Sequence, residues 1–125
     1  MVKGLYEAVV EALKDATRDY EGEIEENGRE TTFSSVNTLD TWSNEWDEDA
    51  NSIEFVHKYR KIPCTISIRE YEEFVSVDLE EATCEYIGGM ASPCDCVEEA
   101  KERILYGLKR YNYRKKKGFE QLSLF

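Results

Sequence analysis

The sequence has few of the features that place a protein in a membrane or outside the cell. Among its 125 residues, no apolar run approaches the roughly 18 residues that a membrane span requires. The first apolar residues are interspersed with charged ones such as Lys3 and Glu7, a pattern unlike a signal peptide. We therefore expect a soluble, cytoplasmic protein with one folded domain, since domains typically run to about 100–150 residues.

Basic residues are scarce over most of the chain. The formal net charge is −11, and residues 109–125 alone carry +5, so residues 1–108 carry −16. An acidic body of this kind repels nucleic-acid phosphates, which argues against direct sequence-specific binding of nucleic acid and favours a protein partner. The basic end segment contrasts with this body and marks a separate functional part of the chain.

Residues typical of catalytic sites are few and poorly spaced. His57 is the only histidine and stands in a strand pattern with no obvious relay nearby, so we interpret it as a packed or edge histidine. The adjacent acids Asp47, Glu48 and Asp49 lack the distant partners that a metal-dependent nuclease needs. We expect a protein that is not an enzyme, with no catalytic residues and no cofactor.

The cysteines leave one alternative open. Zinc-site cysteines usually occur in pairs separated by two to four residues, and only one close pair is present here. In a reducing compartment, free thiols are the simpler interpretation. The four residues concerned are Cys64, Cys84, Cys94 and Cys96.

The first half of the chain predicts a helix, a polar turn and a short strand. Apolar residues recur every three or four positions over residues 2–20, as on one face of an amphipathic helix. Residues 21–32 are polar and contain breakers, so we expect a turn, followed by a short strand over residues 33–39. Residues 40–51 fit no regular period and predict a loop, in which Trp42 and Trp46 either anchor the core, the interpretation that we favour, or bind a ligand.

The second half predicts a meander and a second helix. Apolar residues alternate over 53–59, 62–68 and 75–79, and a fourth strand is expected over 83–87, with Pro63 near an edge or a bulge. Ser92 and Pro93 have the character of a helix start, and an apolar stripe then continues to about Arg114. The expected fold class is α+β: an N-terminal helix, a three- to four-stranded antiparallel meander, a C-terminal helix and a flexible C-terminal tail.

The tail carries a recognisable string. After the basic segment Arg114-Lys115-Lys116-Lys117, the chain ends in Gln121-Leu122-Ser123-Leu124-Phe125. This string resembles, at all five positions, the motif by which many bacterial replication and repair proteins bind the DNA sliding clamp, the beta subunit of DNA polymerase III. Its chance occurrence in a chain of this length is on the order of 10⁻⁴. The resemblance covers these residues only.

The resemblance implies a role for each tail residue. Gln121 would form hydrogen bonds in a small subsite, Leu122 would pack at the rim, Ser123 would be a spacer, and Leu124 and Phe125 would fill an apolar pocket. The basic segment would contact DNA inside the clamp or the acidic outer face of the clamp, unless it only complements the helix dipole. We expect a compact acidic domain over residues 1–114, and a basic linker with a clamp-binding peptide over 115–125.

Two functions remain open from the sequence. In the first, the protein occupies the peptide pocket of the clamp and so regulates or inhibits replication in a bacterial cell or a phage-infected host, at the replisome or nucleoid. In the second, the acidic body imitates DNA and inhibits a host DNA-binding enzyme, with the clamp as a tether. The candidate carboxylates for mimicry are Glu21, Glu23, Glu25, Glu26, Asp47, Glu48, Asp49, Glu70, Glu72, Glu73, Glu80, Glu81 and Glu85.

Overall fold

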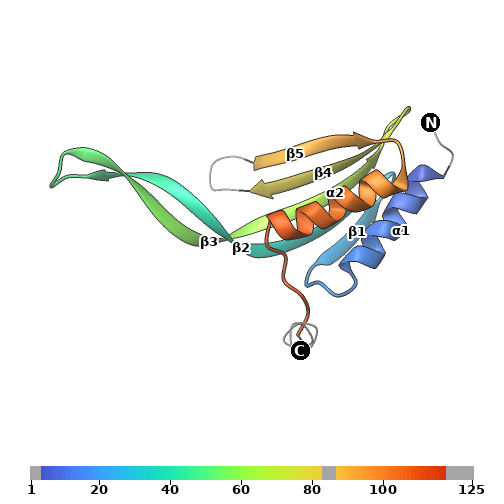
Figure 1. Ribbon diagram of the computed structural model, residues 1–125, viewed down its shortest axis with the longest axis horizontal. Coiled ribbons are helices and arrows are strands. Elements are labelled where there is room, and N and C mark those ends of the chain that lie inside the picture. Colours follow the sequence, from blue (N-terminus) through green and yellow to red (C-terminus); the bar gives the residue numbers. More distant parts are fainter. Residues whose placement is uncertain (1–3, 83–86, 118–125) are drawn as a thin grey trace.

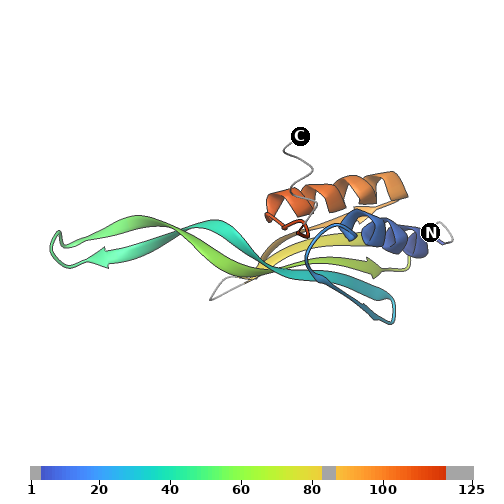
Figure 2. The same ribbon diagram turned by 90° about the horizontal axis from the view of Figure 1, so that it is seen from below.

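The computed structural model describes residues 4–82 and 87–117. One antiparallel sheet contains the strands in sequence order, so each strand pairs with the next. Both helices cover the same face of this sheet (Figures 1 and 2). The predicted α+β order of helix, meander and helix is confirmed, with five strands in place of three or four. The elements are α1 (Leu5–Thr17), β1 (Glu23–Asn27), β2 (Glu30–Asp47), β3 (Ser52–Glu70), β4 (Val75–Ala82), β5 (Ile87–Cys94) and α2 (Val97–Arg110).

The hydrophobic core lies between the two helices and the sheet face that they cover. The apolar stripes predicted for both helices are buried, and alternate residues of the strands meet them. Gly107 lets α2 approach β4 closely, because a Cβ atom there would lie 2.5 Å from Leu79 Cδ2. Fully or almost fully buried members are Val9, Leu13, Phe33, Ile66, Ile68, Val75, Val77, Leu79, Ala100 and Ile104.

The predicted start of the second helix is wrong. Residues Ser92 to Cys94 belong to β5, and α2 begins only at Val97. Ser92 pairs with Val77 of β4, and its hydroxyl accepts a hydrogen bond of 3.0 Å from Arg103 Nη2. Backbone pairing with β4 therefore takes the place of the helix cap that we expected at these positions. The helix also ends at Arg110 and not at Arg114.

A strand that the sequence did not predict opens the sheet. Residues 23–27 form β1, which pairs with β2 across the turn at Gly28, where φ is +64°. All five residues of β1 are exposed, so the strand has no apolar alternation for a sequence pattern to detect. Its backbone pairing with β2 defines it. The predicted turn is confirmed only at Gly28 and its neighbours.

Strands β2 and β3 are far longer than predicted. The short strand expected over 33–39 is part of β2, and the predicted loop over 40–51 is wrong, because β2 continues to Asp47 and β3 starts at Ser52. The two strands predicted over 53–59 and 62–68 are one continuous strand. Pro63 pairs with Val36 beside Cys64, the residue at which β3 pairs with the last β4 partner, Glu81. Pro63 therefore lies where β3 no longer has β4 as a neighbour, and such an edge position tolerates the missing N–H of proline.

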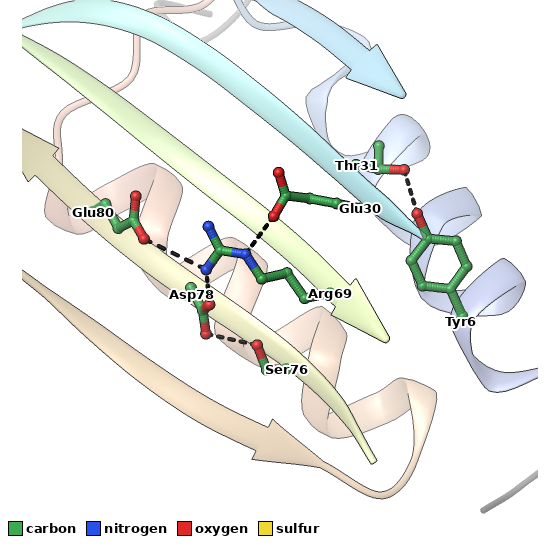
Figure 3. Close-up of polar contacts among 7 residues, drawn as sticks. All are labelled: Tyr6, Glu30, Thr31, Arg69, Ser76, Asp78 and Glu80. Atoms are coloured by element: carbon green, nitrogen blue, oxygen red, sulfur yellow. Dashed lines mark hydrogen bonds and ion pairs between the residues drawn. The ribbon is translucent and has the colours of Figure 1, made fainter. Parts of the chain in front are cut away.

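A polar cluster connects three strands on the sheet face that the helices leave open (Figure 3). Arg69 of β3 forms ion pairs with Glu30 of β2 and Asp78 of β4, and its Nη1 atom lies 3.6 Å from Glu80 Oε1. Ser76 donates a 2.7 Å hydrogen bond to the same Asp78 carboxylate. The hydrogen bond with Glu30 is the largest cause that raises the pKa of Arg69. The cluster thus links β2, β3 and β4 to one another.

Two predicted segments lie partly or wholly outside the described residues. Of the strand expected over 83–87, only Ile87 is described, as the first residue of β5. The motif at 121–125 lies outside as well. Among the described residues, neither helix has the length and apolar character needed to cross a membrane.

The Arg69 cluster yields a stability prediction. Arg69→Met leaves Asp78, which is only 6% exposed, without its cation, and should lower the free energy of unfolding by about 2–4 kcal/mol. Chemical denaturation measures the change. Combining Arg69→Met with Asp78→Asn removes the stranded charge, so the double variant should be more stable than the sum of the two single losses. Simple additivity would show that the two side chains do not interact.

Candidate protein-interaction site

The most prominent surface feature is a two-stranded arm formed by residues 40–59. β1 stops pairing with β2 at Ser34, and β4 stops pairing with β3 at Cys64, whereas β2 and β3 stay paired out to Asp47 and Ser52. Over the arm, all of which the structure describes, β2 and β3 therefore have only each other as described strand neighbours. Figures 1 and 2 show the arm projecting from the body as a twisted ribbon.

The arm has one apolar face and one polar face. The register pairs Trp42 with His57, Asn44 with Phe55, and Trp46 with Ile53, and side chains directly paired across two strands point to the same face. The intervening pairs give the opposite face. The apolar face consists of four rows, Asp40–Tyr59, Trp42–His57, Asn44–Phe55 and Trp46–Ile53.

Large apolar side chains on this face are exposed to solvent. The exposed fractions are 67% for Trp42, 58% for Trp46 and 73% for Phe55. The prediction that both tryptophans anchor the core is therefore wrong. Trp42 lines a hollow with Lys109 and Arg110 of α2 at the root of the arm, yet the greater part of all three side chains is left uncovered by the described residues. A continuous exposed apolar patch of this kind marks an interaction site.

His57 lies in the middle of the apolar face. Its ring centroid is 4.9 Å from that of Trp42 and 5.0 Å from that of Tyr59, and its Nε2 atom contacts the Asp40 carboxylate. The strand position predicted for His57 is confirmed. Asp40 is the one acid of the apolar face, and His57 gives its carboxylate a polar partner at the root of the arm.

The polar face and the tip carry the other charges of the arm. Lys58 pairs with Glu45 across the strands, and the Thr41 hydroxyl donates a 2.9 Å hydrogen bond to the Lys58 carbonyl. At the tip, Asp47 Oδ1 accepts hydrogen bonds from the backbone N–H groups of Asp49 at 3.0 Å and Ala50 at 3.3 Å. Asp47 thus shapes the turn. No group of three metal-ligating side chains comes together within the part of the chain that the structure describes.

Two of the described cysteines, Cys64 and Cys94, are buried. Burial raises the pKa of the Cys64 thiol to about 11, and burial is also the main cause that raises the pKa of Cys94. Both thiols therefore stay protonated near neutral pH and are poor nucleophiles. Cys96 precedes α2, and Cys84 lies outside the described residues.

A groove between β5 and α2 also has a charged lining. Its cation, Arg103, donates hydrogen bonds of 2.9 Å to Met90 Sδ and 3.0 Å to Ser92 Oγ. The guanidinium is thus engaged by the walls of the groove. The arrangement fixes α2 against β5 and does not present a free cation to a ligand.

The carboxylates considered for DNA mimicry do not form one row. Asp47 and its two acidic neighbours lie at the arm tip, whereas Glu72 and Glu73 lie in the β3–β4 turn at the opposite end of the sheet (Figure 1). Glu80 and Glu81 are consecutive in β4 and point to opposite faces. Glu70 is engaged in an ion pair with Arg29, and Glu85 lies outside the described residues.

The basic segment is fixed to the body by its backbone. Lys115 forms a bridge with Tyr20, and the Lys116 N–H donates a 2.7 Å hydrogen bond to the Asp19 carbonyl. Just before it, Tyr113 is buried and stacks on Phe33 with ring centroids 5.5 Å apart. The side chains of Arg114, Lys115, Lys116 and Lys117 are exposed. Four cationic side chains are thus displayed from a fixed stretch of backbone beside the end of α1.

Sequence reasoning missed the arm as a site, although a signal was present. Alternation over 40–46 mirrors the alternation over 53–59, and the two halves flank a turn-forming stretch that includes Asp49 and Asn51. Asp40 and Asn44 interrupt the apolar series on one strand, which hid the period of two. Only the pairing with β3 shows that Trp42 and Trp46 share a face with Phe55.

Buried Cys64 gives a test of the cysteine environment. A thiol-specific reagent should titrate the same number of cysteines in the native wild type and in native Cys64→Ala, because Cys64 is 1% exposed with a raised pKa. After denaturation, the variant should show one thiol fewer. If the native variant also shows one reactive thiol fewer than the native wild type, Cys64 is accessible in the folded protein.

The clamp-motif residues Gln121, Leu122, Ser123, Leu124 and Phe125 begin four positions after Lys117, the last described residue. The structure therefore brings the auxiliary basic residues together beside α1 and is silent on the motif. Comparison with protein-family models, with curated proteins and with solved structures found no match to this chain.

Proposed function

We propose that this protein binds a bacterial DNA sliding clamp through Gln121 to Phe125 and thereby regulates or inhibits DNA replication without being an enzyme. The observation that carries the proposal is the five-residue string itself, which follows the described body within a few residues. Three large apolar side chains in this string favour a partner that buries them. Occupation of the clamp pocket would exclude polymerase subunits that use the same pocket.

The strength of the peptide contact sets the expected mode of action. Burying Leu122, Leu124 and Phe125 contributes roughly 1.5–3 kcal/mol each. Ordering five residues costs about 1–2 kcal/mol per residue, so the peptide alone binds weakly. A useful affinity then needs further contacts from the body or two peptides on one ring.

The short spacing between Lys117 and Gln121 supports a contribution from the body. An extended chain spans at most about 3.3–3.6 Å per residue, so the motif begins within roughly 15 Å of Lys117. Lys117 belongs to the basic segment that is fixed beside α1. A clamp bound at the motif would therefore lie close to Arg114, Lys115 and Lys116, where an acidic clamp surface would be attracted.

The net charge of the body favours competition for the clamp pocket over a role in contact with DNA. Residues 1–108 carry a net charge of −16 and would be repelled by DNA near the ring. DNA mimicry would need carboxylates in a row, and the described candidates are spread over both ends of the sheet. Truncation of the chain after Lys117 distinguishes mimicry from competition for the clamp.

Leu124→Ala combined with Phe125→Ala should abolish co-elution with a purified clamp, because it removes both side chains expected in the apolar pocket. The body should keep its thermal unfolding transition. Binding is measured by gel filtration and by surface plasmon resonance with immobilised clamp. The matched control is Leu105→Ala with Tyr106→Ala, which removes two exposed apolar side chains from α2 and should bind as the wild type does.

A chain truncated after Lys117 separates the two functions. Loss of clamp binding together with loss of replication inhibition supports competition for the pocket. Inhibition of a host DNA-binding enzyme that survives the truncation would instead identify the acidic body as the active part. Clamp binding that survives the truncation would contradict the proposal.

A further inference from the structure

The apolar face of the arm lacks a described cover. Trp42, Trp46, Ile53, Phe55 and Tyr59 are between 58% and 73% exposed. An isolated two-stranded ribbon is marginally stable in water and needs packing on one face. The described residues of this chain supply none, so the face is suited to contact with another molecule.

The chemistry of the arm restricts the class of that molecule. Residues 40–59 contain six acids and one lysine, a net charge of −5, which repels nucleic acid and anionic lipid. On the apolar face, the single acid, Asp40, is paired with His57. The complementary surface is therefore an apolar protein surface.

We propose that this surface is the same face of a second copy, so that the protein forms a dimer through its arms. The five exposed side chains offer about 600–700 Å² per copy, since a large aromatic buries roughly 150–250 Å² when fully covered. Two copies then bury about 1,300 Å² in total, within the roughly 1,200–2,000 Å² of stable interfaces. The two-fold axis makes the same patch serve both partners.

Charge sets the orientation of the two arms. Each copy carries a net charge of −11, so the bodies repel one another. In the reversed arrangement, the root of each arm lies against the tip of the other. The bodies then lie at opposite ends of a ribbon eight residues long, about 26 Å at 3.3 Å per residue. This distance exceeds the Debye length of about 8 Å at physiological salt. Repulsion between the bodies is therefore screened only in the reversed arrangement.

The reversed orientation also matches the rows of the face. The row Asp40–Tyr59 of one copy lies opposite the row Trp46–Ile53 of the other, and Trp42–His57 lies opposite Asn44–Phe55. Each polar side chain thus faces a row that contains at least one large apolar residue. Asp40 and His57 remain paired with each other at the root.

The test compares two variants that place the same charge on opposite faces. Phe55→Glu puts a carboxylate on the apolar face, and Val56→Glu puts it one residue further on the polar face. Sedimentation of the full chain over a range of concentrations should give twice the monomer mass of 14.6 kDa for the wild type and for Val56→Glu. Phe55→Glu should raise the dimer dissociation constant by about 30-fold or more.

Tryptophan fluorescence provides a direct probe of the arm, because Trp42 and Trp46 are the only tryptophans of the chain. Emission should shift to shorter wavelength as the wild type associates and should stay constant in Phe55→Glu. Both variants should keep the circular dichroism of the folded body. A wild type that remains monomeric, or equal loss of dimer in the two variants, would overturn the proposal and leave the arm to a different protein.

The dimer does not rest on clamp binding. The variant with Leu124→Ala and Phe125→Ala should dimerise as the wild type does, since neither residue belongs to the arm. Failure of the arm dimer with intact clamp binding, or the reverse, would therefore identify which of the two proposals is wrong.

Discussion

The structure depends on one uninterrupted ladder between β2 and β3, from the pair Glu30–Arg69 to the pair Asp47–Ser52. At its inner end, this ladder is the middle of the sheet, flanked by β1 and β4 and covered by the helices. At its outer end, it continues as a free ribbon. The same backbone pairing therefore builds the core and carries the arm, so the position of the arm is fixed by the rigid body from which it emerges.

Register gives the arm its chemical character. Because the side-chain period of a strand is two, a slip of one residue between β2 and β3 would place Trp42 and Phe55 on different faces. The core end resists such a slip, since Phe33 and Ile66 pair on the helix-covered face and are almost fully buried. The Arg69 cluster pins the open face at the same end. Core packing thus determines which side chains gather on the distant arm.

The two proposals concern different parts of the molecule and are compatible. The arm projects from one end of the sheet, whereas the basic segment is fixed beside the end of α1. A dimer joined through its arms would carry two clamp-binding peptides. Two weak peptides on a ring with several pockets reach a much higher avidity than one, provided that the spacing suits the ring. Such a dimer would compensate for the weak energetics expected of each peptide alone.

The sequence by itself determined the fold class, the apolar stripes of both helices, and the partition of charge between the body and residues 109–125, because these follow from local composition and period. It also supplied the tail string as a linear motif. Only the tertiary structure decided the existence of β1, the start of α2 and the continuity of β3. Each of these depends on backbone pairing with a strand distant in sequence, which leaves little local pattern. The arm is the clearest case: the local pattern favoured Trp42 and Trp46 as core residues, and pairing with β3 places both on the exposed apolar face of the arm.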